Sequence, residues 1–356
     1  MDTRMKPGLQ HKKLIIFLSL LTLPFTTTVG QDWKTLLDLR GTWRIELGDN
    51  MEWADPKFND SKWDDIKVPA AWENEGFPGY DGYAWYRKHF TINPDLKNDH
   101  VYLHVGYVDD VSEVYLNGHF IGFQGMFPPN FTTAYNTYGQ YAVPQQYLNY
   151  KGDNVVAVRV YDMMMAGGIT NGRIGLFEAR DYLKPDYAIT GTWKFRTGDD
   201  ESWKDANIDD SKWKDVVVPA YWETQGFKEY DGIGWYRLKF TTPQQFTEKR
   251  LILLVGKIDD IDETYLNGEL VGKTGRIRAG MTLADVGDSY TQLRAYTISS
   301  DILLPGQENV LAVRVDDVYM HGGIYDGPIG FVTRDKYLRW KKERDEWWNL
   351  FHWFDN

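Results

Sequence analysis

Residues 109–118 of the chain read DDVSEVYLNG, and residues 259–268 read DDIDETYLNG. In both stretches a run that contains β-branched residues, Tyr and Leu ends at Asn-Gly, and strand-like residues resume directly afterwards (HFIGF and ELVG). Asn-Gly between two such runs favours a two-residue type I′ turn, because that turn needs a positive φ at two successive positions. Each stretch therefore predicts an antiparallel β-hairpin that begins with an acidic pair.

The two hairpins belong to a longer internal repeat. The segment from Gly41 to Phe90 aligns without a gap on Gly191 to Phe240, at an offset of 150 residues. The alignment slips by five residues after the hairpins and resumes with NVVAVRV on NVLAVRV, at 154–160 and 309–315. A long self-match of this kind indicates two copies of one domain. We expect a signal peptide at 1–30, domains at 31–184 and 185–338, and an amphipathic helical tail at 339–356.

The repeated segments read as short strands separated by Gly, Pro, Asn and Asp, without a long helical period between them. That pattern favours an antiparallel sheet over a parallel sheet with crossover helices. The predicted fold is all-β, with two tandem antiparallel β-sandwiches of the jelly-roll, galactose-binding-like type and a short C-terminal helix. Five tryptophans of the first copy each have a counterpart in the second, which indicates core or frame residues.

Composition and charge exclude some partners. The 356 residues carry a net charge of -11 and include no Cys. Because the Lys and Arg residues form no basic stripe, nucleic acid is not an expected partner. The N-terminus is basic, then apolar over LIIFLSLLTLPF, then small, which is the order of a secretory signal peptide; a membrane anchor is the alternative. We expect a periplasmic or secreted protein, with no transmembrane span after signal removal.

Strand parity gathers several loops at one end of each sandwich, opposite the Asn-Gly turn. In the first copy these are residues 73–82, 109–110, 126–138 and the glycine-rich DMMMAGGITNGR from Asp162. In the second copy they are 223–232, 259–260, 276–289 and 316–327. Loops at the end of a sandwich are frequent recognition surfaces, so this end is the expected ligand-binding end.

These residues together resemble a known family. The stretches FNDSKWDDIKVPAAWENEGFPGYDGYAWYRKHF, VGYVDDVSEVYLNGHFIG and NVVAVRV resemble the sugar-binding jelly-roll domain of glycoside hydrolase family two enzymes, such as β-galactosidases and β-glucuronidases. The stretch IDDIDETYLNG is also similar to copies of that domain within bacterial sialate O-acetylesterases. The resemblance implies a galactose-binding-like fold and a carbohydrate ligand. It transfers no catalytic glutamate, because those lie on a (β/α)₈ barrel that needs about 250 further residues.

The acidic pairs have three open interpretations. Asp109 and Asp110, with their counterparts Asp259 and Asp260, could cap loop N–H groups, as Asp commonly does in turns. They could instead hold a cation, with Ca²⁺ expected because it prefers hard oxygen ligands. A catalytic pair is the third interpretation, although successive residues of a strand point to opposite faces. We expect no other cofactor.

Two further pairs of carboxylates are candidates for catalysis. Glu73 and Asp81, and equally Glu223 and Asp231, lie eight residues apart on one loop and could straddle a glycosidic bond. Because both pairs are duplicated together with Arg87, binding to the frame through an Arg87–carboxylate ion pair is the alternative.

The loop that follows the hairpin differs between the copies. The first copy has aromatic residues there (Phe127, Phe131, Tyr135 and Tyr138) and the second has basic ones (Arg276, Arg278 and Arg294). Aromatic faces stack on sugar rings, and Arg grips carboxylates or sulfates, so a neutral and an acidic subsite are expected. His321 is a further binding candidate that only the second copy has. Packing of both loops on neighbouring domains is the alternative.

The sequence as a whole predicts an exported, non-catalytic carbohydrate-binding protein of polysaccharide degradation. Its expected partner is an oligosaccharide or polysaccharide, with an acidic one among the candidates, and a separate catalytic protein is a second candidate partner. Two such modules in one chain would raise the avidity for a polymer. The alternative is a family two-like glycosidase or a carbohydrate esterase, acting alone or as a subunit. The tail has Trp340, Trp347 and Phe354 at a spacing of seven, which indicates an amphipathic helix that packs on the sandwiches or docks elsewhere.

Overall fold

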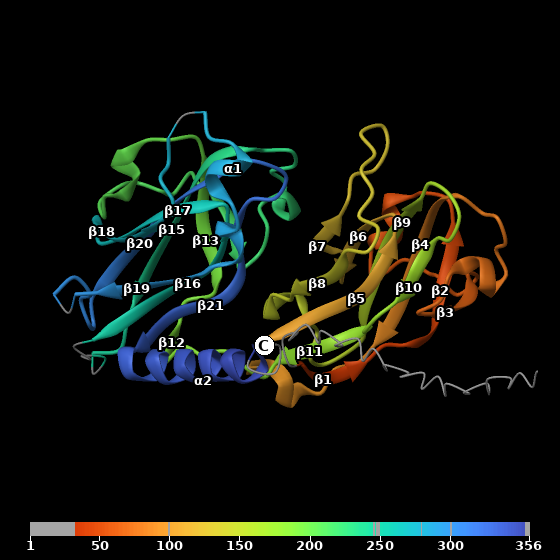
Figure 1. The fold of residues 1–356 in the computed structure, drawn as a ribbon, viewed down its shortest axis with the longest axis horizontal. Helices are drawn as coiled ribbons and strands as arrows, with labels where there is room; N and C mark the ends of the chain where they lie inside the picture. Colours follow the sequence, from red (N-terminus) through yellow and green to blue (C-terminus); the bar gives the residue numbers. More distant parts are fainter. Residues whose placement is uncertain are drawn as a thin grey trace, which may run out of the picture.

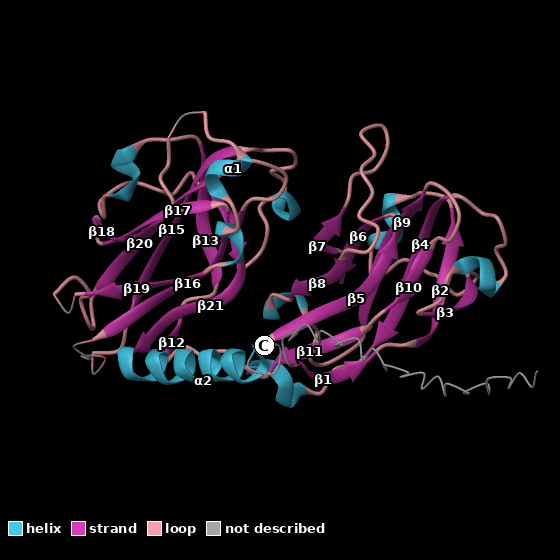
Figure 2. Ribbon diagram, in the orientation of Figure 1, coloured by secondary structure: helices cyan, strands magenta, loops and turns pink. Residues whose placement is uncertain are grey.

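The computed structural model describes residues 33–352 apart from 99, 245, 247–249, 279 and 300, and it leaves the side chains of 98 and 346–352 undescribed. The predicted signal peptide lies outside this range. Two β-sandwiches stand beside each other, and the C-terminal helix runs along the base of the second (Figure 1). Strands make up most of both bodies, and helices are few and mostly short (Figure 2). The predicted all-β fold of antiparallel sandwiches is therefore confirmed.

The first sandwich has two sheets. One has the strand order β3-β2-β4-β9-β6-β7. Its strands are β2 (Gly41–Leu47), β3 (Asp64–Val68), β4 (Gly82–Phe90), β6 (Val111–Leu116), β7 (His119–Gln124) and β9 (Asn154–Asp162). The other has the order β1-β11-β5-β10, with β8 also paired to β5. Its strands are β1 (Trp33–Asp38), β5 (Val101–Asp109), β8 (Tyr138–Ala142), β10 (Gly168–Asn171) and β11 (Gly175–Ala179).

The second sandwich repeats this order. One sheet runs β14-β13-β15-β20-β17-β18 and the other β12-β21-β16-β19. The first comprises β13 (Gly191–Thr197), β14 (Lys214–Val218), β15 (Gly232–Thr241), β17 (Ile261–Leu266), β18 (Glu269–Thr274) and β20 (Glu308–Asp317). The second comprises β12 (Tyr187–Ala188), β16 (Leu251–Asp259), β19 (Leu293–Ile298) and β21 (Gly323–Thr333).

Helices are short, with one exception. The α-helices are α1 (Leu283–Val286) and α2 (Arg334–His352). The 3₁₀ turns are η1 (Met51–Ala54), η2 (Trp72–Glu75), η3 (Pro94–Asn98), η4 (Gln145–Tyr147), η5 (Glu201–Lys204), η6 (Glu223–Gln225) and η7 (Ser289–Thr291). A search of the described residues finds no helix with the length and apolar character needed to cross a bilayer.

Both predicted Asn-Gly hairpins are present. Leu116 pairs with His119 across the first turn, and Leu266 pairs with Glu269 across the second. Asn117 and Gly118 have φ of 51° and 81°, as a type I′ turn requires. The Asn117 side chain also accepts a hydrogen bond from the Val155 N–H at 2.8 Å. This contact fixes the hairpin to the start of β9 at the end of the sandwich opposite the acidic pair.

The repeated tryptophans form the frame, as predicted. Six are almost completely buried: Trp43, Trp72, Trp85, Trp193, Trp222 and Trp235. The Gly-Gly sequences that follow β9 and β20 are explained by two of these rings. A Cβ on Gly167 would lie 2.2 Å from Cζ2 of Trp72, and the same atom on Gly322 would lie 2.1 Å from Cζ2 of Trp222.

The arginine that both copies of the frame carry has a partner other than the one expected. Arg87 Nε contacts Asp60 Oδ2 at 2.8 Å, and Arg237 contacts Asp210 at 3.0 Å in the second sandwich. Both guanidinium groups are fully buried. The predicted ion pair of Arg87 with the loop carboxylates Glu73 or Asp81 is therefore wrong, because Arg87 is turned towards η1 and the segment that follows it.

The sandwiches touch through a small set of side chains. The Tyr102 hydroxyl donates to Asp326 Oδ1 at 2.6 Å, and the rings of Phe123 and His321 stack with centroids 4.2 Å apart. Strand β7 of the first sandwich packs on η6 of the second. The second sandwich thus presents its loop end to the edge of the first.

The tail is helical as predicted, and α2 begins at Arg334, five residues before the predicted start. Trp340 packs on the cluster formed by Leu183, Ile252, Leu254 and Val332, and its Nε1–H donates to the Asp181 carbonyl at 2.6 Å. The first turns of α2 therefore cover the second sandwich. The side chains of Trp347 and Phe354 lie outside the described part.

Candidate functional site: the acidic rims

The loops predicted to converge do so at one end of each sandwich. We call residues 73–81, 109–110, 125–137 and 162–167 the first rim, and residues 223–231, 259–260, 275–292 and 317–322 the second rim. They lie together because β5 ends at Asp109, β7 ends at Gln124 and β9 ends at Asp162, while β4 begins at Gly82. Antiparallel neighbours place all of these termini at one end.

Asp110 fastens two loops of the first rim to each other. Its Oδ1 accepts a hydrogen bond from Thr133 Oγ1 at 2.6 Å, and its Oδ2 accepts from the Met163 N–H at 3.1 Å. Thr133 Oγ1 in turn accepts from the Tyr135 N–H at 3.0 Å. Asp260 makes the equivalent contact in the second rim, to the Val318 N–H at 2.9 Å. The acidic pairs therefore include a loop anchor in both copies.

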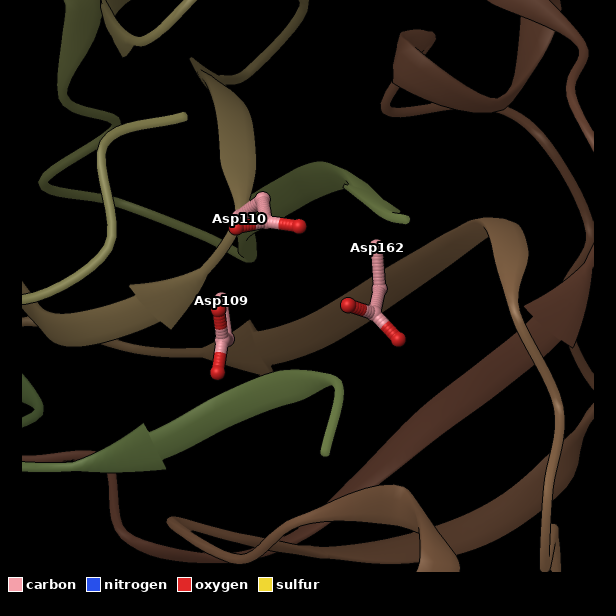
Figure 3. Close-up of side chains that lie close together, drawn as sticks. All are labelled: Asp109, Asp110 and Asp162. Carbon is pink, nitrogen blue, oxygen red and sulfur yellow. The ribbon is translucent and has the colours of Figure 1, made fainter. Parts of the chain in front are cut away.

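Three carboxylates of the first rim face one another. Asp109, Asp110 and Asp162 each offer an oxygen, and these oxygens all lie within 4.8 Å of one another (Figure 3). Asp109 and Asp110 are half-buried, whereas Asp162 is fully buried. Burial, and then repulsion from Asp110 and Asp162, raises the pKa of Asp109 to about 7. Burial raises the pKa of Asp162 to about 6.

The glutamates of the two rims hold the Gly-Gly turns. Both carboxylate oxygens of Glu73 accept from the Gly167 N–H at 3.3 Å, and Glu223 Oε1 accepts from the Gly322 N–H at 3.0 Å. Asp81 and Asp231 are exposed at the far ends of their loops. These contacts show that both glutamates hold the backbone of the Gly-Gly turns. A catalytic role for Glu73, Asp81, Glu223 and Asp231 stays a prediction.

The second rim contains the same carboxylates in a buried setting. Glu223, Asp260 and Asp317 are 4%, 4% and 1% exposed. Burial raises the pKa of Glu223 to about 8, and burial with the neighbouring carboxylates raises the pKa of Asp259 and Asp317 to about 9. Near neutral pH these groups are largely protonated. The two rims thus differ mainly at Glu73 and Asp110, which are half-buried, and at their counterparts Glu223 and Asp260, which are buried.

The aromatic loop of the first rim separates into exposed and packed rings. Tyr135 is 62% exposed. Phe127 lies under the guanidinium of Arg159, 4.1 Å from its ring centroid, and Phe131 packs edge-on against Tyr161. The Tyr138 hydroxyl bonds to His104 Nδ1 at 2.9 Å within the sheet. Tyr135 is therefore the ring of this predicted set that is most available for stacking.

The basic residues of the second rim also differ in availability. Arg276 is exposed, and Arg278 is exposed and paired with Asp285. Arg294 is 1% exposed and forms a fully buried ion pair with Asp262 at 3.0 Å, so its guanidinium is not free to grip a ligand. His321 is half-buried under Phe123.

Two features of the rims were not predicted. Asp162 and Asp317 complete the acidic groups, and the signal for them was their repetition five residues before Gly167 and Gly322. The Asp262–Arg294 pair corresponds to Ser112 and Gly139 in the first copy, since Arg294 and Gly139 pair with the equivalent Gly256 and Gly106. A comparison of both positions between the copies would have indicated the contact.

Comparison with known proteins places the chain in a family. The sequence model described as "Beta-galactosidase second all-beta domain" matches residues 47–166 and again 198–320. The chain belongs to this family. The two matched ranges cover the strands that build both rims, so each sandwich carries the all-β domain of family two-like glycoside hydrolases. The resemblance to sialate O-acetylesterases stays a prediction.

The curated relatives are much longer proteins, and the match to this chain spans only about 15% of their length. A β-galactosidase of Thermoanaerobacter pseudethanolicus is 33% identical over 113 residues, which is 29% of this chain and 14% of that protein. The β-galactosidase BoGH2A of Bacteroides ovatus is 29% identical over 144 residues, which is 35% of this chain and 15% of that protein. Among solved structures, a β-glucuronidase of Bacteroides uniformis is 16% identical, with a TM-score of 0.34 over 80% of this chain and 28% of that one.

Proposed function

We propose that this protein is a non-catalytic carbohydrate-binding protein that acts in polysaccharide degradation and binds sugar at the first rim. The observation that carries the proposal is the difference between the two rims. Glu73 and Asp110 are half-buried in the first rim, whereas their counterparts Glu223 and Asp260 are buried in the second, where η6 packs on β7. Names of the relatives, which are β-galactosidases, support a carbohydrate as the ligand class.

The first rim has the chemistry that a neutral sugar requires. An exposed aromatic ring stacks on the apolar face of a pyranose, and carboxylate oxygens accept hydrogen bonds from its hydroxyl groups. Tyr135 supplies the ring, and Asp81 and Asp110 supply acceptors at exposed and half-buried positions. Thr133 connects the two parts, because it bonds both Asp110 and the Tyr135 backbone. Like charges would repel a uronate here, so we assign any acidic sugar to Arg276 and Arg278 on the second rim.

Export through residues 1–30 is part of the same proposal, because extracellular polysaccharide is the expected target. We expect processing before Gln31 and a mature protein in the periplasm or the medium. Expression of the full chain in a bacterial host, followed by fractionation and N-terminal sequencing, would test this. Retention of the unprocessed chain in the cytoplasm would contradict it.

A glycan array followed by calorimetry on the array hits tests the binding function. We expect weak binding of neutral oligosaccharides, on the order of micromolar to millimolar, with Tyr135→Ala weakening it about tenfold or more. Tyr319→Ala is the matched control, because Tyr319 is also an exposed tyrosine, at 52%, but belongs to the second rim. No binding across a broad panel, or equal losses in both variants, would overturn the proposal.

The same polysaccharides separate binding from hydrolysis. Incubation of the protein with them, followed by measurement of released reducing ends and acetate, should give no signal above a buffer blank. Release that disappears in Glu73→Gln would instead establish a glycosidase or esterase.

A further inference from the structure

We propose that the first rim holds a hard divalent cation of the Ca²⁺ class between Asp109, Asp110 and Asp162. The cation site shares Asp110 with the sugar site proposed above but does not include the exposed Tyr135 ring, and separate measurements of Ca²⁺ and glycan binding test the two proposals. Three aspartates come from two connections of the fold, the β5–β6 corner and the end of β9 (Figure 3).

Oxygen spacing is the first argument. Ca²⁺ binds protein oxygens at about 2.3–2.6 Å, so two oxygens on one ion can be no further apart than about 5 Å. One carboxylate oxygen from each of Asp109, Asp110 and Asp162 lies within 4.8 Å of the other two. Three carboxylates at this spacing repel each other unless a positive charge lies between them. Carboxylate oxygens are also the ligands that hard cations prefer.

A buried oxygen without a donor is the second argument, and it is independent of the spacing. Asp162 is 0% exposed, and its Oδ2 has no hydrogen-bond partner. Its Oδ1 has only the Met164 N–H, at 3.3 Å. A buried carboxylate oxygen that lacks any donor is costly, and a metal ion is one of the few partners that can satisfy it. In Figure 3 the carboxylate of Asp162 is turned towards the other two aspartates.

The second rim serves as an internal comparison. Within the described part of the chain, the equivalent Asp259, Asp260 and Asp317 do not bring three oxygens within the same distance. Asp317 is buried like Asp162 and its Oδ2 also has no hydrogen-bond partner, but Asp260 is almost completely buried where Asp110 is half-buried. The site is therefore expected in the first sandwich alone, although the sequence carries the same three aspartates twice.

The cation would lie where the loops of the first rim are joined. Asp110 already contacts Thr133 on one loop and the Met163 N–H on another. A bound ion would add Asp109 and Asp162 to this connection, so that the corner after β5, the aromatic loop and the turn after β9 become one unit. Binding should therefore raise the thermal stability and slow amide exchange in residues 126–137 and 163–167.

Calcium binding by the full chain tests the inference directly. The protein, freed of metal with EDTA and then dialysed, is titrated with CaCl₂ by calorimetry, with MgCl₂ as the comparison ion. We expect close to one Ca²⁺ per chain and a rise in melting temperature. Asp109→Asn should weaken Ca²⁺ binding at least about tenfold, because the site loses one of its three charges.

Asp259→Asn is the matched control, since it makes the same change at the equivalent position of the second sandwich. It should leave the Ca²⁺ affinity and stoichiometry unchanged. Asp162→Asn, whose amide oxygen can still accept from the Met164 N–H, provides a second loss-of-binding variant if Asp109→Asn does not fold. Absence of binding by the parent protein at millimolar CaCl₂, or unchanged binding in a folded Asp109→Asn or Asp162→Asn variant, would overturn the inference.

The sugar experiment distinguishes the two proposals. Glycan binding that persists in EDTA, together with one bound Ca²⁺ in its absence, supports both. Ca²⁺ binding without any glycan binding supports the cation site and removes the proposed function.

Discussion

Phe123 and His321 stack across the contact between the sandwiches, with their ring planes 18° apart. Phe123 lies on β7 of the first sandwich, and His321 lies on the Gly-Gly turn of the second rim. The first copy has Ala166 where the second has His321. Only the Gly-Gly turn of the second copy therefore carries a ring at this position, and that ring packs on the first sandwich. This contact helps to explain why Glu223 and Asp260 are buried in the second copy, whereas Glu73 and Asp110 are half-buried in the first.

Removal of the Phe123 ring should loosen the second rim. Phe123→Ala is expected to lower the free energy of unfolding by about 1 kcal/mol and to speed amide exchange in residues 318–322. Phe131→Ala, which removes a ring from the first rim only, should leave exchange in residues 318–322 unchanged. Equal exchange in all three proteins, measured by mass spectrometry, would show that the stacking does not hold the rim closed.

Burial of Glu223 makes stability depend on pH. The unfolded side chain ionises near pH 4.3, whereas the folded pKa is raised to about 8, so its stabilising contribution is complete at low pH and is lost as the pH rises through about 8. Glu223→Gln removes this loss and keeps an acceptor for the Gly322 N–H. In thermal unfolding, the Glu223→Gln variant should melt at no higher a temperature than the parent protein near pH 4 and at a higher temperature than the parent near pH 8.

The matched change for that series is Glu73→Gln, because Glu73 makes the same contact in the open first rim. We expect Glu73→Gln to change the melting temperature near pH 8 much less than Glu223→Gln does. A Glu223→Gln variant whose melting temperature follows the parent at every pH would contradict the burial argument.

Stability should depend on whether one or both partners of the buried Asp262–Arg294 ion pair are replaced. Arg294→Met leaves the charge of Asp262 fully buried, which typically costs about 3–5 kcal/mol. Adding Asp262→Ser, the residue of the first copy at that position, removes the uncompensated charge and should restore part of the stability. Urea unfolding of the single and double variants checks this, and a double variant less stable than Arg294→Met would refute it.

The hairpin turn of the first sandwich should need Asn at position 117. Ala at a φ of 51° is strained, and it would also lose the bonds to the Val155 N–H and to the Tyr147 carbonyl. We expect Asn117→Ala to destabilise the protein by about 2–3 kcal/mol in urea unfolding. Asn117→Asp, which keeps an acceptor for Val155, should cost less than Asn117→Ala.

Much of the fold could be predicted because the sequence patterns that indicate it are local and occur in both copies. The Asn-Gly turns require particular backbone angles, and the strands alternate visibly, so Asn117 and Asn267 fixed two hairpins without any knowledge of packing. Strand parity then placed the acidic pairs at the opposite end. The partner of Arg87 could not be predicted, because Asp60 and Glu73 are equally plausible carboxylates until the path of η1 is known.

The repeated sequence by itself determined two antiparallel sandwiches, their tryptophan frame and the end at which the carboxylates gather, because turn geometry and side-chain alternation act over a few residues. Tertiary structure alone decided which rim is accessible. Burial depends on what the neighbouring sandwich covers, and the Phe123–His321 stacking joins residues almost two hundred positions apart. The same three aspartates therefore form a close group of oxygens in one copy and not in the other, where burial raises the pKa of Asp259 and Asp317 to about 9.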